Sequence, residues 1–357
     1  MKCIFWVDGS AQIGLGHIYR AKTLADALRH RFNAHCSIAT GADSGSLSPG
    51  RMSFERLHEI PAGGDIRRTF GAVLALLQKA GADLLIIDKP KYPPELFSEL
   101  QRAREGRMAP AIAAFDAAYM PTGCVDVIID ANRDESEARR FKNSGTLALF
   151  GPAYAALATE FADSRGQLTL KDNLERITIS MGGSDPNFIS LMAYDAAKMM
   201  QHIEINIVMG AAAPETYIQE LSSVVDKSRA TIYRNLSRPE LAHLFSNSDG
   251  CIVAGGVTML EAAAVGLPLI VISQNPPQLE NARILETRGA IVNAGLFSRI
   301  STQDILSILL KWEREPALRH DLSRKAINAV DGLGIDRICS ALQEAVATRQ
   351  SKGPPQG

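Results

Sequence analysis

Short apolar runs alternate along the chain with longer stretches whose apolar residues recur at helical spacing. The apolar runs are rich in Ile, Val and Leu, which is typical of strands buried on both faces. We therefore predict an α/β fold in which parallel sheets are covered by helices. The predicted strands are Cys3–Val7, Cys36–Ala39, Leu84–Asp88, Ala111–Phe115, Val125–Asp130, Arg176–Ser180, Ile203–Met209, Ala230–Tyr233, Gly250–Val253, Leu269–Ile272 and Ala290–Val292.

These strands form two similar arrays that follow one another along the chain. The polar stretch at 162–176 lacks helical periodicity and precedes a new strand, so we predict a domain boundary near Arg165. The expected domains are 1–165 and 166–350, each a Rossmann-like parallel sheet, and the Pro/Gly tail at 351–357 should be disordered. Ligands bind beyond the carboxyl ends of strands in such sheets. The loops that follow strands are therefore the candidate sites.

Composition and charge narrow the class of protein. The 357 residues have a formal net charge of -1, with Lys and Arg spread along the sequence, so we expect no nucleic-acid partner. No apolar run approaches the ~20 residues that span a bilayer, and the chain begins directly in a strand. The five cysteines form no CxxC or Cys/His cluster, which indicates reduced core residues. We expect a cytoplasmic protein without a membrane span, with the oligomeric state open and a monomer favoured.

The first strand leads into a glycine-rich bend and a helix, "VDGSAQIGLGHIYRAKTLA". Gly14 and Gly16 allow a tight turn, and His17 begins the helix close to the positive end of its dipole, where a neutral imidazole is favoured. A neutral imidazole can take a proton from water, so His17 is a candidate base with Asp8 beside it. The alternative is that His17 only caps the helix or satisfies a buried donor.

In the second half, "SMGGSDP" places Gly182, Gly183 and Ser184 directly after a strand. Glycines permit close approach to a phosphate, and the free amides of a helix start attract anions. The alternative is an ordinary turn in which Asp185 caps a helix that begins at Pro186.

A second glycine pair, Gly255 and Gly256, follows the strand in "CIVAGGVTMLEAAAVGLP". The free amides and the Thr258 hydroxyl could hold a diphosphate, and Glu261 could accept hydrogen bonds from two ribose hydroxyls. The alternative is that Glu261 only interacts with the helix dipole. The chain has no P-loop, no GxSxG elbow and no residue spacing typical of a metal site, so we expect neither a metal nor a cofactor.

Together these motifs resemble the UDP-2,4-diacetamido-2,4,6-trideoxy-β-L-altropyranose hydrolases of pseudaminic acid biosynthesis and their relatives in spore-coat polysaccharide biosynthesis. Besides the glycine-rich segments above, the shared motifs are "LLIID", "AAFD", "IIDAN", "FGPAYAALATEF", "NLSRPELAHLFSNSDG" and "DGLGIDRI", in the family's order over nearly the whole chain. The resemblance implies a GT-B fold, with two Rossmann-like domains facing a central cleft and UDP bound mainly by the C-terminal domain.

The resemblance also implies roles for individual residues. His17 would activate water to attack the anomeric carbon, and Asp8 matches an acidic residue of the first motif. The family's Asn-Gln pair near the reaction centre reads Pro277-Gln278 here, with Asn275 slightly upstream and Asn281 downstream. The sequence departs from the family at positions that face the sugar in the family, namely Trp6, Pro90, Ala117, Ala158 and Pro277.

We therefore expect a hydrolase that releases UDP from a UDP-linked diacetamido-type deoxy sugar, in nonulosonic acid or surface glycan biosynthesis. Two alternatives stay open. The first is a glycosyltransferase of the same fold, in which His17 deprotonates an acceptor hydroxyl. The second is a nucleotide-sugar-binding paralogue without catalysis.

Overall fold

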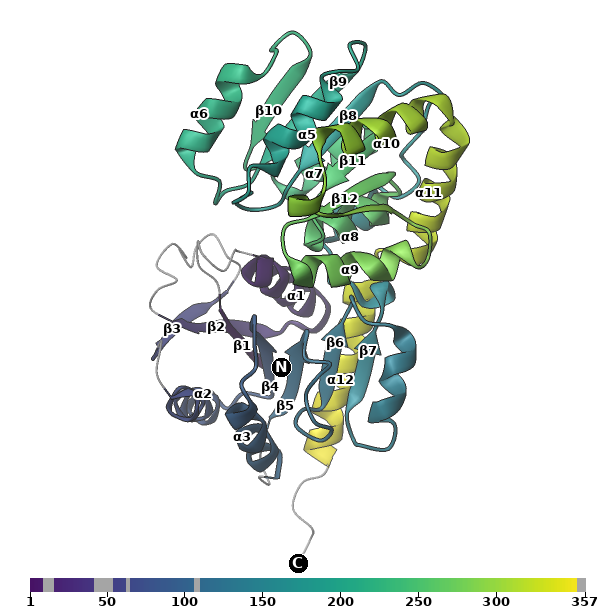
Figure 1. The fold of residues 1–357 in the computed structure, drawn as a ribbon. Helices are drawn as coiled ribbons and strands as arrows, with labels where there is room; N and C mark the ends of the chain where they lie inside the picture. The colour runs from purple at the N-terminus through teal and green to yellow at the C-terminus, as the bar shows by residue number, and fades with distance from the viewer. Residues whose placement is uncertain (9–15, 42–53, 62–64, 106–109, 352–357) are drawn as a thin grey trace, which may run out of the picture. The chain divides into compact units, whose positions relative to one another are not determined.

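The computed structural model describes residues 1–8, 16–41, 54–61, 65–105 and 110–351 (Figure 1). The chain divides into two compact units, which are described separately below. Unit 1 comprises Met1–Ala156 and Leu333–Gly357, and unit 2 comprises Leu157–Gly332. Gly14 and all of the predicted tail except Ser351 lie outside the described residues.

Unit 1 is built on a parallel sheet whose strand order is β3-β2-β1-β4-β5-β6-β7. Its strands are β1 Lys2–Val7, β2 His35–Gly41, β3 Arg56–Ile60, β4 Leu84–Asp88, β5 Ala111–Phe115, β6 Val127–Asp130 and β7 Leu147–Phe150. Its helices are α1 Gly16–Phe32, α2 Ile66–Ala80, α3 Pro94–Glu105 and α12 Gly334–Ser351, with the 3-10 turns η3 Glu135–Phe141 and η4 Pro152–Tyr154.

Alternate residues of the unit 1 strands point to opposite faces of the sheet, as a pleated strand requires. Phe5 and Ile86 face a core that includes α1 and α12, whereas Ile4 and Leu85 face a core that includes α2 and α3. Both faces are therefore apolar, which explains the continuous apolar runs of the central strands.

Unit 2 is built on a parallel sheet of order β10-β9-β8-β11-β12-β13. Its strands are β8 Arg176–Ser180, β9 Glu204–Met209, β10 Ala230–Arg234, β11 Gly250–Val253, β12 Leu269–Ser273 and β13 Val292–Leu296. Its helices are α4 Thr159–Asp163, α5 Ile189–Ala197, α6 Glu215–Val224, α7 Arg238–Ser246, α8 Val257–Val265, α9 Pro276–Glu286, α10 Thr302–Arg314 and α11 Pro316–Ala329, with the 3-10 turn η5 Phe297–Arg299.

The last helix, α12, corrects the predicted division of the chain. It was expected in the second domain, but Ile338, Cys339 and Leu342 are buried in the core that α1 and the first sheet share (Figure 1, yellow). Arg165, the predicted boundary, lies inside unit 2, where its guanidinium donates to the carbonyls of Ile327 and Asp331, each at 3.1 Å. The sequence prediction missed this arrangement because periodicity shows that a helix has an apolar face without showing which sheet receives it.

The described part of the chain contains no helix that is both long and apolar enough to cross a membrane. All five cysteines are buried.

Candidate functional site

Polar side chains of unit 1 gather where the strand order of its sheet reverses. β1 and β4 are neighbours in the sheet, and the chain leaves them toward opposite edges, which makes their carboxyl ends a topological switch point. His17 is the second residue of α1, the helix that follows β1, and Asp88 is the last residue of β4. His17 and Asp88 therefore lie where α/β sheets bind ligands.

His17 and Asp88 form the central pair of this cluster. The Nδ1 atom of His17 lies 2.6 Å from Oδ1 of Asp88, whose side chain is fully buried. We assign the proton of the imidazole to Nδ1, because the neighbouring carboxylate is an acceptor only. The other ring nitrogen, Nε2, is then free to accept a proton from a ligand.

Arg20, one helical turn after His17, clamps the same carboxylate. Its Nε donates to Oδ2 of Asp88 at 2.8 Å, and its Nη2 donates to Oδ1 at 2.6 Å and to Oδ2 of Asp116 at 2.6 Å. Burial alone would raise the pKa of Asp88, but the charge of Arg20 and the hydrogen bonds from His17 and Arg20 lower it to about 2. Asp88 is therefore a carboxylate at neutral pH.

The ligand atoms of His17, Asp88 and Asp116 all lie within 4.8 Å of one another, a spacing that a metal ion could bridge. Arg20 already contacts both carboxylates, and its Nη2 lies 3.4 Å from Nδ1 of His17. The guanidinium thus supplies the positive charge that two neighbouring carboxylates require.

A third carboxyl group, Asp130, follows at the end of β6. Asp116 has a left-handed backbone conformation, with φ of 51°, and its amide donates to the Ile129 carbonyl, so it sits beside Asp130 in the sheet. Burial, with the charge of Asp116, raises the pKa of Asp130 to about 7. A positive φ in a residue other than glycine is uncommon and is often found at functional sites.

Asp8, the acidic residue predicted beside His17, has a different partner. Its Oδ1 lies 2.7 Å from Nζ of Lys89, and that ammonium lies 4.1 Å above the ring of Trp6. Gly16 is the first residue of α1. The carboxylate that holds His17 is thus Asp88, from β4, the neighbour of β1 in the sheet.

In unit 2 both predicted glycine pairs also lie at a reversal of strand order. β8 and β11 are neighbours, Gly182 and Gly183 follow β8, and Gly255 and Gly256 follow β11. A Cβ atom on Gly255 would lie 2.4 Å from the carbonyl oxygen of Gln278, so the chain passes there only because the residue is glycine. α8 begins next, at Val257, with Thr258 in its first turn.

Glu261 lies on α8 and is almost completely buried. Its Oε1 accepts a hydrogen bond of 2.5 Å from Nη1 of Arg238, the first residue of α7. Burial raises the pKa of Glu261, and the positive charge of Arg238 acts against this rise. Glu261 is therefore a buried carboxyl group with a cationic partner.

Asn275 and Gln278 have local structural partners. The Asn275 side chain caps α9 by accepting from the amide of Gln278 at 3.0 Å, and the Gln278 side chain accepts from the amide of Gln274 at 3.0 Å. Asn281, one turn further on, donates to the Gly255 carbonyl at 3.4 Å. The Asn281 bond ties α9 to the glycine loop after β11.

The turn after Gly183 differs from the expected helix start. Ser184 is half-buried, and α5 begins at Ile189 rather than at Pro186. The Asp185 carboxylate nevertheless accepts from the amides of Ile189 and Ser190, each at 2.9 Å, and from the Tyr217 hydroxyl at 2.9 Å. Three intervening residues separate the cap from the helix, which sequence patterns do not resolve.

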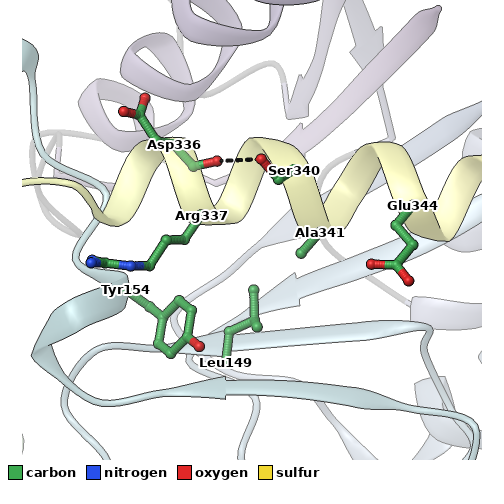
Figure 2. A pocket seen from close by; sticks show the side chains of 7 residues that line it. All are labelled: Leu149, Tyr154, Asp336, Arg337, Ser340, Ala341 and Glu344. Atoms are coloured by element: carbon green, nitrogen blue, oxygen red, sulfur yellow. Dashed lines mark hydrogen bonds between the residues drawn. The ribbon is translucent and has the colours of Figure 1, made fainter.

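Two surface cavities of unit 1 lie among the described residues. One, of about 410 Å³, runs between α12 and the segment Leu149–Tyr154 (Figure 2). Two of its charged residues have structural partners: Asp336 pairs with Arg31 at 2.5 Å, and Arg337 donates to the Ala153 carbonyl at 2.9 Å.

The other cavity, of about 530 Å³, begins two residues after Asp88. Its lining is mostly apolar and aromatic and consists of Pro90, Lys91, Tyr92, Pro93, Pro94, Phe97 and Tyr119. Tyr92 is itself buried, with its hydroxyl 2.6 Å from the Phe115 carbonyl, while Tyr119 is 49% exposed.

Sequence reasoning did not assign functional roles to Asp88, Arg20, Asp116 or Arg238. The available signal was positional, since Asp88 and Asp116 each lie at or just after the end of a predicted strand. Arg20 lies three residues after His17, on the same face of the helix. Arg238 carried no such signal, because its partner lies on another helix.

No known family model matches the sequence. The chain is 26% identical over 346 residues to the spore coat polysaccharide biosynthesis protein SpsG of Bacillus subtilis, over 95% of this chain and 97% of that protein.

Solved structures with the same architecture cover nearly the whole chain. MurG of Acinetobacter baumannii superimposes with a TM-score of 0.67 at 14% identity, over 96% of this chain and 100% of that one. UDP-GlcNAc 2-epimerase of Neisseria meningitidis, bound to UDP-GlcNAc, gives 0.62 at 13% identity, over 96% and 100%. The spinosyn rhamnosyltransferase SpnG, in complex with spinosyn aglycone, gives 0.63 at 14% identity, over 95% and 100%. The chain therefore has the GT-B fold of two parallel-sheet α/β units.

Proposed function

We propose that the protein transfers the sugar of a nucleotide sugar to a hydroxyl nucleophile, with His17 as general base. The observation that carries this proposal is the 2.6 Å contact between His17 Nδ1 and Asp88 Oδ1, which leaves Nε2 as the proton acceptor. The nucleophile's oxygen attacks the anomeric carbon, the bond from that carbon to the diphosphate oxygen breaks, and the proton passes to Nε2. Asp88 stabilises the imidazolium that forms.

The loops of unit 2 are proposed to bind the nucleotide. Amides after Gly255 and Gly256, together with the Thr258 hydroxyl, would hold the diphosphate at the start of α8, where the helix dipole favours negative charge. Glu261 would accept hydrogen bonds from the ribose hydroxyls. The nucleotide is proposed to be UDP, because the solved epimerase of the same fold contains UDP-GlcNAc. The proposed reaction uses no metal or cofactor.

We favour an acceptor alcohol over water as the nucleophile. The relative from Bacillus subtilis is named for polysaccharide biosynthesis, and the solved rhamnosyltransferase of the same fold holds an aglycone. The apolar cavity that includes Phe97 and Tyr119 gives unit 1 room for an acceptor with an apolar group.

Hydrolysis is the second candidate, supported by the run of motifs shared with the UDP-sugar hydrolases of pseudaminic acid biosynthesis. The sugar would then be a diacetamido deoxy sugar, and water would take the place of the acceptor. The same base would serve both reactions.

The test measures UDP release from a panel of UDP-amino sugars by the purified protein, with and without candidate acceptors. Wild type is compared with His17→Ala and with His30→Ala, an exposed histidine of the same helix. Release that needs both His17 and an acceptor supports the transferase, and acceptor-independent release supports the hydrolase. Undiminished release by His17→Ala would exclude His17 as the base. UDP binding without release under any condition would indicate a binding protein.

A further inference from the structure

The two oxygens of the Glu261 carboxylate differ in their partners. Oε1 is bonded to Arg238 at 2.5 Å, whereas Oε2 is buried and has no hydrogen-bond partner within the described structure. A side-chain hydrogen bond from Thr258 acts to lower the pKa of this carboxyl, as Arg238 does, but it gives Oε2 no partner at hydrogen-bond distance. The side chain is only 3% exposed. A buried oxygen of a charged group without a donor is costly and calls for an explanation, and a ligand that supplies the missing donor provides one.

The place of this oxygen indicates what kind of donor it would meet. Glu261 lies one helical turn after Thr258 on α8, the helix whose start follows the Gly255–Gly256 turn. A ligand whose phosphates lie at that start would present the hydroxyls of its sugar further along the same helix. A hydroxyl is a donor of the right strength for a carboxylate oxygen.

Arg238 fixes the direction in which that oxygen points. It is the first residue of α7, and the start of α7 is held by a capping box in which the Ser237 amide and hydroxyl donate to Oε2 of Glu240 at 2.8 and 2.6 Å. α7 packs directly on α8. The Arg238 guanidinium therefore reaches Glu261 from a helix start that is held in place by its cap and by packing on α8.

We infer that Arg238 is a positioning residue that makes the nucleotide site selective for ribose over 2′-deoxyribose. By holding Oε1, it directs Oε2 toward the ribose hydroxyls of the nucleotide. This inference rests on the proposed nucleotide site in unit 2 and is independent of the role of His17. Arg238 would thus set the selectivity without touching the ligand.

The experiment measures the affinities of UDP and 2′-deoxy-UDP for the full-length protein by calorimetry. Wild type should prefer UDP by about 10- to 100-fold, the range expected for a hydrogen bond to a charged group. Arg238→Met should reduce this preference to about twofold or less, and Arg238→Lys should retain part of it, since lysine keeps the charge but not the planar fork. Arg176→Met, which breaks a 2.6 Å pair with Glu204 at the amino end of β8, is the matched control and should keep the full preference.

Removing Arg238 leaves a buried carboxylate unpaired, which could unfold the protein. The double variant Arg238→Met/Glu261→Gln removes the charge as well, and it should fold and bind both nucleotides equally. A preference for UDP that survives Arg238→Met, even with both affinities lowered, would overturn the inference. Equal binding of both nucleotides by wild type would also overturn it. Absence of UDP binding by wild type would overturn the nucleotide site itself.

Discussion

Nδ1 of His17 and Oδ1 of Asp88 lie 2.6 Å apart, although the two residues are 71 positions apart in the sequence. They meet because β1 and β4 are neighbours in the sheet, with Val7 in register with Asp88. The helix that follows β1 then brings its imidazole over the end of β4. The strand order therefore creates the acid–base pair.

Asp88→Asn should reduce turnover by about 10²- to 10⁴-fold, because the amide carries no charge to stabilise the imidazolium. Asp8→Asn is the control, since Asp8 pairs with Lys89 instead, and it should cost less than about tenfold. The measurement is UDP release at saturating donor, with circular dichroism to verify folding. Equal losses in the two variants would contradict the assignment.

Arg20→Lys should destabilise the fold by about 2–4 kcal/mol, because a lysine cannot bridge Asp88 and Asp116 with the same geometry. Arg29→Lys, on the more exposed surface of the same helix, should change stability by no more than about 0.5 kcal/mol. Urea denaturation measures both free energies of unfolding. A cost for Arg20→Lys as small as that of the control would show that the bridge contributes little.

Asp130→Asn should flatten the pH dependence of stability. The folded carboxyl has a pKa of about 7, against 3.8 for an ordinary aspartate, so the folded state holds the extra proton between these values. Raising the pH through this window therefore lowers wild-type stability, by up to about 4 kcal/mol, and the asparagine variant should lack this contribution. The test compares free energies of unfolding at pH 5 and pH 8. An unchanged difference in the variant would count against a protonated Asp130.

Gly255→Ala should destabilise unit 2 by about 1–3 kcal/mol or more, because the new methyl group would lie 2.4 Å from a backbone oxygen of Gln278. Gly256→Ala is the matched control, since its nearest neighbour, Nε2 of Gln278, is 3.9 Å away. The control should fold normally yet bind UDP more weakly if phosphate approaches the backbone there. Thermal melting and UDP titration separate the two effects. Similar melting temperatures for the two variants would show that the loop after β11 can move aside.

The sequence predicted the central strands well because both of their faces are buried. Leu84–Asp88 and Ala111–Phe115 match β4 and β5 residue for residue. The strands β3 and β7 were missed. Each pairs along one edge only, and its first residues are exposed or half-buried. The last strand of unit 2, predicted at Ala290–Val292, begins only at Val292, for the same reason.

The candidate site was predicted less completely than the fold. His17 and the glycine pairs carry local signals, because a strand followed by glycines and a helix is recognisable in sequence. The partners Asp88 and Arg238 do not, because each reaches its partner through sheet order or helix packing. Asp8 is nearer to His17 in sequence than Asp88, yet it is Asp88 that holds the imidazole.

The return of α12 to unit 1 has a consequence for the order in which the chain can fold. Unit 2 is one continuous segment, Leu157–Gly332, inserted into unit 1. The chain leaves unit 1 and returns to it at neighbouring points, where Gly334 packs against the backbone of Ala155. During synthesis unit 2 is complete before α12 emerges, whereas unit 1 still lacks a side of its core that includes Ile338 and Leu342. Unit 1, whose first segment is synthesised before unit 2, should therefore finish folding last. Until α12 packs, the apolar face of unit 1, the unit that carries His17, must be covered by some other contact.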